Sequence, residues 1–178
     1  VAFIVGSALL ALARHGGPAH RPEEVKAPTN LEYGAMAAII LAHVALCRLT
    51  LFVSDTYTAL SPSLIASVLP LCFGPMLCAV LIRRRQAHAA AYVCSVLLGV
   101  ITQFNFAVML TSLISALVGI HFLSPLRRRS RIYEAGLLAG AGAGVVNMVF
   151  GFMWEVPWSV IGLQAVAALG TAFAASLL

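Results

Sequence analysis

The polar side chains that could carry chemistry in this sequence are few, and several stand inside or beside apolar runs. His43 and Arg48 lie within the run from 31 to 53, and Asp55 follows it closely. An ionisable side chain inside an apolar helix is a candidate for function by default. Arg48 and Asp55 are seven residues apart, on one face of a helix, so they could form an ion pair that bridges a cavity or contacts a further domain. Alternatively, Arg48 extends to the nearer polar boundary and meets Asp55 there without any functional role.

The histidines and cysteines do not have the spacing of a metal or haem site. A bis-histidine haem would need a second ligand facing His43, whereas His88 and His121 are expected near the polar ends of other runs. His15 and His20 lack a companion cysteine or acidic ligand. The cysteines lack C-x-x-C spacing and are predicted to be buried apolar residues: Cys47, Cys72, Cys78 and Cys94. We therefore expect no cofactor or metal in this chain.

Catalytic signatures are also missing from the sequence. It contains no H-E-x-x-H, G-x-S-x-G or P-loop motif, no pair of carboxylates inside an apolar run, and no His-Asp dipeptide. If the whole protein is an enzyme, its catalytic residues are expected outside this chain.

The composition predicts the elements that position these side chains. Hydrophobic residues make up 61% of the chain and charged residues only 10%, against about 25% charged in soluble proteins, and the mean hydropathy is +0.98. A helix that spans a membrane needs about 20 apolar residues. We therefore predict an all-α, polytopic membrane helix bundle that forms a single transmembrane domain over residues 1–178. Its seven spans are predicted at about 1–13, 31–53, 62–82, 86–102, 106–123, 132–153 and 159–178.

Two of these spans contain helix-modifying patterns. The third carries Pro70, Gly74 and Pro75, and because proline removes a backbone donor and clashes with the preceding turn, a kink or break is expected near 70–75. In the sixth, glycines recur every four residues on one face and allow another helix to approach closely. An amide in the same span is expected to bond a neighbouring helix. These packing residues are Gly136, Gly140, Gly144 and Asn147. The partner helix could belong to the same chain or to a second copy in a homodimer.

The basic residues predict the orientation of the bundle. Ten of the eleven Lys and Arg residues fall in the loops after the first, third and fifth spans, and the loops after the second, fourth and sixth hold none. Basic loops stay on the cytoplasmic side, so the N-terminus is predicted outside and the C-terminus inside. Two of the clusters are Arg83, Arg84 and Arg85, and Arg127, Arg128, Arg129 and Arg131. Topology accounts for the net charge of +5, so we expect the lipid bilayer, and no nucleic acid, as a partner.

Both ends of the sequence are typical of a piece of a longer protein. The chain begins with Val1 rather than Met, and its first apolar run lacks the basic flank and cleavage site of a signal peptide. It ends at Leu178 within an apolar run, without a closing loop. We expect flanking soluble domains that are absent from this chain.

Two stretches resemble a known family. The third span opens with Leu60-Ser-Pro-Ser-Leu-Ile-Ala, and the sixth with Arg127-Arg-Arg-Ser-Arg-Ile-Tyr-Glu-Ala-Gly-Leu-Leu-Ala-Gly, followed by Val146-Asn147. They are similar to the Ser-x-x-Leu-Ile-Pro and Arg-Arg-Ser-Asp-Leu-x-x-Ala-Gly-Leu-x-x-Gly patterns of bacterial seven-transmembrane receptors with an intracellular HD hydrolase domain. Some members of that family are cyclic di-AMP phosphodiesterases. Ala66 and Arg131 depart from the pattern, where the family usually has Pro and Asp.

The resemblance implies a function for the chain. It would be the membrane domain that relays an extracytoplasmic signal to a cytoplasmic, metal-dependent HD phosphodiesterase in the bacterial plasma membrane. The partners would be the protein's own extracytoplasmic and HD domains, and the metal centre would lie in the HD domain. A rival interpretation is a small transporter component that binds a small molecule, because interrupted helices often line substrate sites. A membrane scaffold without any ligand is a third.

Overall fold

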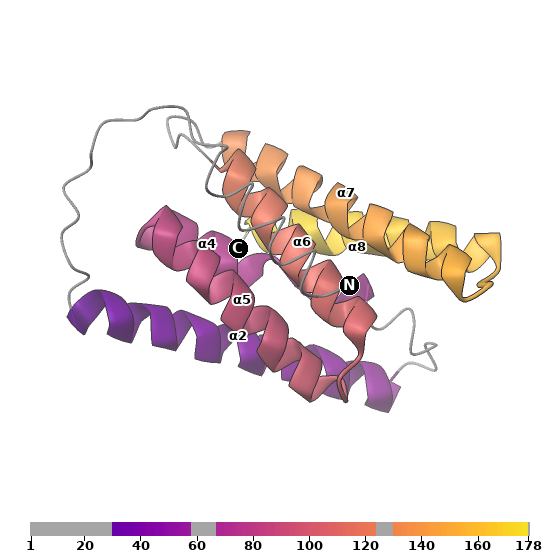
Figure 1. Ribbon diagram of the computed structural model, residues 1–178, viewed down its shortest axis with the longest axis horizontal. Coiled ribbons are helices and arrows are strands. Elements are labelled where there is room, and N and C mark those ends of the chain that lie inside the picture. The colour runs from indigo at the N-terminus through magenta and orange to yellow at the C-terminus, as the bar shows by residue number, and fades with distance from the viewer. Residues whose placement is uncertain (1–29, 58–66, 124–129, 178) are drawn as a thin grey trace.

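The computed structural model describes residues 30–57, 67–123 and 130–177, which form six α-helices and no strand (Figure 1). The all-α class is thus confirmed for this part of the chain. The helices are α2 (Asn30–Tyr57), α4 (Phe73–Leu81), α5 (Arg84–Ile101), α6 (Phe106–Phe122), α7 (Ser130–Met153) and α8 (Trp158–Leu177). The first predicted span, 1–13, lies outside the described residues.

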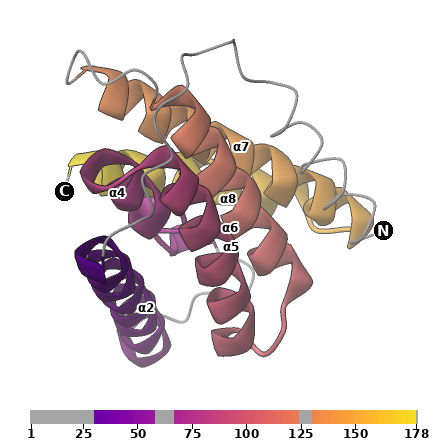
Figure 2. The same ribbon diagram turned by 60° about the vertical axis from the view of Figure 1, so that its left-hand side comes forward.

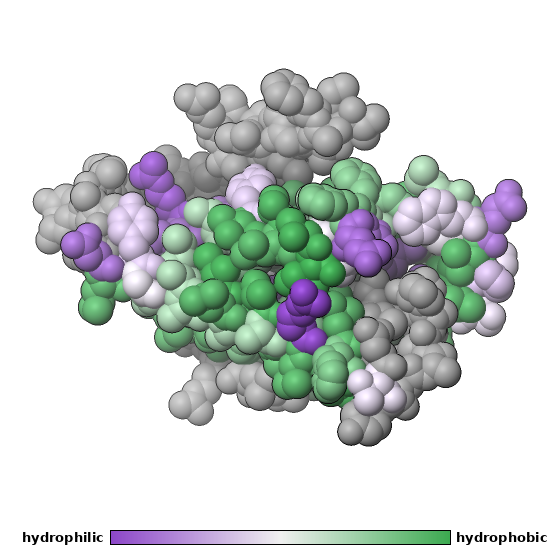
Figure 3. Space-filling view, turned by 90° about the horizontal axis from the view of Figure 1, so that it is seen from below, coloured by the Kyte–Doolittle hydropathy of each residue, from purple (hydrophilic) through white to green (hydrophobic). Residues whose placement is uncertain are grey.

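Three helices are long and apolar enough to cross a membrane by length and composition: Asn30–Ser54, Ile132–Met153 and Trp158–Ala175. Helix α6 is also apolar but has 17 residues. Helix α4 has only nine residues, which is about 14 Å at 1.5 Å per residue and too short to span by itself. Large apolar side chains cover much of the outer surface, and apolar residues gather across the middle of the face in Figure 3. The chain is an integral membrane protein.

The helices form an antiparallel bundle (Figures 1 and 2). Helix α4 packs against α2, α5, α6 and α8, while α7 packs between α6 and α8 along its length. The turn at 82–83 brings Arg83, Arg84 and Arg85 to one end of the bundle, which we call the basic end. The turns at 102–105 and 154–157 lie at the other end, where the rings of Phe106 and Phe150 are 6.2 Å apart.

Small side chains form most of the core. Alanine supplies the buried positions of α5 and α7 in the main cluster, and cysteine supplies two of those around α4: Ala87, Ala90, Ala91, Ala135, Ala139, Cys72 and Cys78. Such residues let helix backbones approach closely, which is the usual source of helix association in lipid. The prediction that these cysteines are buried is confirmed, and all four in the chain are free thiols.

The described turns explain where the helices change direction. At the start of α6, the Asn105 side chain accepts hydrogen bonds from the N–H groups of Ala107 (3.1 Å) and Val108 (3.4 Å), which are donors without helical partners. Gln103 and Phe104 before it have positive φ angles of 56° and 60°. At the end of α7, Glu155 has a φ of 53°, a conformation that usually selects glycine at helix ends.

Candidate functional site, a helix break held by buried polar side chains

The third predicted span is interrupted within the bundle. Residues 67 and 68 are helical, 69–72 are not, and α4 begins at Phe73. Pro70 stands in the interruption, where its carbonyl accepts the N–H of Phe73 at 3.2 Å. Pro75 lies in the first turn of α4, where a missing N–H costs little because such groups lack helical partners. The structure therefore places the interruption at 69–72, with Gly74 and Pro75 just after it.

His43 of α2 binds the first turn of α4. Its imidazole is fully buried, and Nδ1 accepts a hydrogen bond from the backbone N–H of Gly74 at 3.3 Å. Nδ1 must therefore be unprotonated, which leaves the proton on Nε2, 3.9 Å from Sγ of Cys47. His43 thus satisfies a donor that the short helix leaves unpaired.

The contact between α2 and α4 requires a glycine. A Cβ atom added to Gly74 would lie 2.9 Å from both Cβ and Cγ of His43, closer than packed carbon atoms approach. The backbone of α4 can approach the imidazole only because residue 74 has no side chain.

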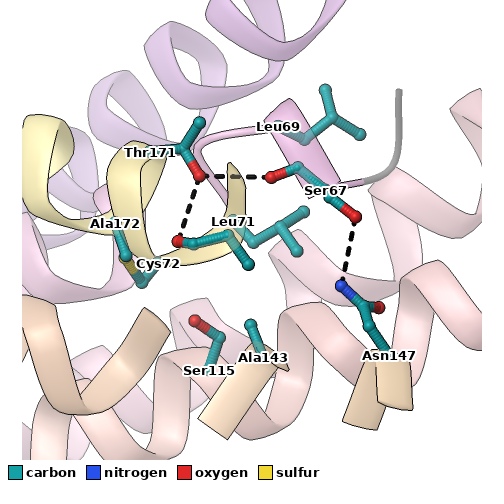
Figure 4. A pocket seen from close by; sticks show the side chains of 10 residues that line it. Ser67, Leu69, Leu71, Cys72, Ser115, Ala143, Asn147, Thr171 and Ala172 are labelled. Atoms are coloured by element: carbon teal, nitrogen blue, oxygen red, sulfur yellow. Dashed lines mark hydrogen bonds between the residues drawn. The ribbon is translucent and has the colours of Figure 1, made fainter. Parts of the chain in front are cut away.

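Side chains from α7 and α8 hold the segment before the break, as Figure 4 shows. Asn147 of α7 donates from Nδ2 to Oγ of Ser67 at 3.2 Å, and its Oδ1 accepts from the hydroxyl of Thr111 in α6 at 3.2 Å. Thr171 of α8 donates to the Ser67 carbonyl at 3.2 Å. Both threonines also donate to carbonyls of their own helices at 2.9 Å or less. Because each hydroxyl has a single hydrogen to share, these contacts between helices are weak.

A small pocket lies beside the break (Figure 4). The space that the centre of a water molecule can occupy in it measures about 10 Å³. The residues that line the pocket include Ser67, Leu71, Cys72, Ser115, Asn147 and Thr171. Such a space holds one water molecule at most, whereas ligand pockets usually measure about 300–1,000 Å³. Within the described residues, no group of three His, Cys, Asp or Glu side chains could hold a metal ion.

Two of the three predicted packing glycines, Gly140 and Gly144, face α8 of the same chain. A Cβ atom on Gly140 would lie 2.9 Å from Cα of Leu169 and 3.0 Å from the carbonyl oxygen of Ala168. At Gly144 the nearest atom would be Cα of Ala165 at 3.7 Å, an ordinary contact distance. Gly136 is buried. Helix α8 therefore occupies this face at Gly140 and Gly144, and the closest backbone approach is at Gly140.

The structure does not test the predicted ion pair between Arg48 and Asp55. Both belong to α2, and the Arg48 side chain is exposed on the outside of the bundle. The Asp55 side chain lies outside the described set, so the ion pair stays a prediction.

The arginines at the basic end make contacts that sequence reasoning missed. Arg84 and Arg85, predicted in a loop, lie in the first turn of α5. Nη2 of Arg84 donates to the carbonyls of Ile120 (3.2 Å) and His121 (2.9 Å) at the end of α6. Those carbonyls have no helical partner, so the guanidinium caps α6 and neutralises its negative end. The repulsion between an arginine and the N-terminus of α5 is thereby offset.

A second set of contacts joins α2 to the same turn. Glu32 lies 3.5 Å from Nη2 of Arg83 and accepts from Nε2 of Gln86 at 3.1 Å. The sequence held a signal for this pair. Glu32 lies in the first turn of α2, and the predicted topology places that turn on the same side of the membrane as Arg83, Arg84 and Arg85. Arg127, Arg128 and Arg129, and the side chain of Arg131, lie outside the described residues.

Comparison with known proteins identifies the family. A family model described as "7TM receptor with intracellular HD hydrolase" matches residues 21–178. No curated protein and no solved structure matches the chain. The match covers most of the sequence and confirms the resemblance carried by the two stretches at 60–66 and 127–147. The chain belongs to the family of seven-transmembrane receptors with an intracellular HD hydrolase.

Proposed function

We propose that this chain is the membrane domain through which an extracytoplasmic signal controls a cytoplasmic HD-type cyclic dinucleotide phosphodiesterase. The observation that carries the proposal is the helix break. On one side of the break, α4 is joined to α2 through His43. On the other side, Ser67 is joined to α7 and α8 through single hydrogen bonds, in a chain of the receptor family. The metal centre of the hydrolase would lie in the HD domain, outside this chain.

The energies of these contacts suit a relay. Hydrogen bonds between membrane helices contribute about 0.6 kcal/mol on average, so a rearrangement that exchanges two of them costs about 1 kcal/mol. A signal molecule whose binding free energies for two helix arrangements differ by about 1 kcal/mol can shift the populations of those arrangements. The helix break therefore provides a place where packing can change without unfolding α7 or α8.

We further propose seven spans in the bacterial plasma membrane, with the N-terminus outside and the C-terminus inside. Apart from Arg48 in α2, the arginines whose side chains are described, Arg83, Arg84 and Arg85, lie at one end of the bundle, as expected for the cytoplasmic side. Exposed Trp154 and Trp158 stand at the other end, where an aromatic belt would meet the outer interface. Single cysteines in place of Arg85 and Glu155, in a background without native cysteines, test the orientation. An impermeant maleimide should label only residue 155 in intact cells, and labelling of residue 85 would contradict it.

The size of the pocket favours a receptor over a transporter component. A discontinuous helix suits both classes, but a space for one water molecule at the break leaves no room there for a small-molecule substrate.

The catalytic half of the proposal is tested on the intact protein in its own membranes. Hydrolysis of cyclic di-AMP and of cyclic di-GMP is measured before and after chelation of divalent metals. We expect one of the two nucleotides to be hydrolysed. The rate of hydrolysis should fall to background on chelation, because the proposed HD hydrolase depends on a bound metal. Absence of hydrolysis of both nucleotides, with the protein correctly inserted, would refute the proposal.

A further inference from the structure

A cluster of nitrogen donors stands at the basic end, between α5 and α6. Arg84 and His88 are one turn apart on α5, so their side chains share a face. His121 lies in the last turn of α6, and Arg84 binds its backbone carbonyl. The two contacts that Nη2 of Arg84 makes with the end of α6 hold the guanidinium in place. Two helices therefore present a preorganised set of donors.

Among the described residues, no carboxylate forms an ion pair with the side chains of this cluster. Glu134, exposed near the start of α7, belongs to the same end of the bundle but is not paired with it. The one ion pair in that part of the chain joins Arg83 to Glu32, and Gln86 also binds Glu32. Glu155 belongs to the opposite end of the bundle. Exposed Arg85 adds a further positive charge beside the cluster.

An apolar strip continues from the cluster along α5. Tyr92, Val93 and Val96 are 38%, 45% and 53% exposed, and with Arg85 they lie at helical spacing on the outside of the bundle. Positive donors at the end of a lipid-facing apolar strip match the two parts of a phospholipid, the phosphate and the acyl chain. A free phosphate would use only the donors, so the strip favours a lipid.

We propose that Arg84, Arg85, His88 and His121 bind the phosphate headgroup of an anionic phospholipid whose acyl chain lies along Tyr92, Val93 and Val96. This site is independent of the hydrolase proposed above, because it needs only the described helices and a lipid. Arg84 both caps α6 and contacts the phosphate. Basic sites between helices at the membrane boundary recognise anionic headgroups in this way.

The test measures lipid retention by the intact protein. The protein is purified with mixed phosphatidylglycerol and phosphatidylcholine, and the ratio of bound lipids is determined by native mass spectrometry. The variants are Arg85→Gln and His121→Gln, both at exposed positions, with Glu155→Gln at the far end as the matched control. We expect Arg85→Gln to lower the ratio of phosphatidylglycerol to phosphatidylcholine about fivefold, as for the loss of one basic residue near a charged surface. His121→Gln should lower this lipid ratio less than Arg85→Gln does. His121→Lys, which keeps a basic side chain at the position, should give the wild-type ratio.

Two results would overturn the proposal. One is a lipid ratio in Arg85→Gln and His121→Gln equal to that of the Glu155→Gln control, which would show that the cluster does not select the headgroup. The other is displacement of phosphatidylglycerol by millimolar inorganic phosphate, which would assign the donors to a free anion. Neither readout depends on nucleotide hydrolysis. A negative result for lipid binding therefore does not bear on the proposed function, and absence of nucleotide hydrolysis would not bear on the lipid site.

Discussion

Replacing Gly74 with alanine tests the contact that positions the short helix α4. The added Cβ would lie 2.9 Å from Cβ and Cγ of His43 and 3.3 Å from its Nδ1. The imidazole must therefore move away from the backbone N–H of residue 74, from which it accepts a hydrogen bond. Overpacking of this kind costs about 1–3 kcal/mol, and loss of the hydrogen bond about 0.5–1.5 kcal/mol. The helix propensity of alanine returns at most about 1 kcal/mol. We therefore expect Gly74→Ala to lower the free energy of unfolding by roughly 1–3 kcal/mol.

The assay is reversible unfolding of the intact protein in mixed micelles, followed as the fraction of denaturing detergent rises. Gly34→Ala is the matched control, because a Cβ there meets no atom within 4 Å. It should leave stability unchanged or raise it by up to about 1 kcal/mol. Equal stabilities for Gly74→Ala and Gly34→Ala would refute the inference that close packing on His43 fixes the break.

A double variant separates the clash from other effects of alanine. His43→Ala removes the imidazole and should cost stability in the wild-type background, since the Gly74 N–H loses its acceptor. In the Gly74→Ala background the same change also relieves the overpacking. We expect the two substitutions to be non-additive by about 1 kcal/mol or more; strict additivity would mean that the residues do not interact.

Further predictions concern the other contacts of the bundle, each read out by the same unfolding assay. Gly140→Ala places a Cβ against the backbone of Leu169 and should destabilise by about 1–3 kcal/mol. Gly170→Ala, in open space, should leave stability unchanged or raise it by up to about 1 kcal/mol. Arg84→Ala removes the cap on α6 and should cost about 0.5–2 kcal/mol; an unchanged midpoint would exclude the cap. Glu155→Gly relieves the positive φ angle of 53° and should stabilise by up to about 1 kcal/mol, so a loss of stability would count against this reading of the turn.

Much of the fold follows from hydropathy and helix-breaking residues. The apolar run from 106 to 123 and the cap at Asn105 define α6, and the Trp154 to Trp158 turn separates α7 from α8 because proline and polar residues interrupt the apolar pattern. The prolines also predicted an interruption of the third span. Its position at 69–72 was less predictable, because Pro75 fits the first turn of a helix as well as it ends one.

The contacts around the break were not predictable from the sequence alone. His43, singled out as an ionisable group in an apolar run, turns out to accept a backbone N–H from Gly74, 31 residues away. Periodicity places a residue on a face but does not say which helix lies opposite. The same limit applies to Ser67 and Thr171, hydroxyl residues whose interhelical partners depend on the packing of three helices.

The rate of nucleotide hydrolysis by the intact protein carrying Asn147→Ala tests the central proposal most directly. The substitution removes the contacts of α7 with Ser67 and Thr111, worth about 1 kcal/mol together, and leaves the hydrolase itself unaltered. If the break relays the signal, the rate in membranes should change about five- to tenfold in either direction, while Gly162→Ala, which meets no atom within 4 Å, keeps the wild-type rate. An Asn147→Ala protein that inserts normally and hydrolyses its substrate at the wild-type rate, with and without signal, would contradict the account.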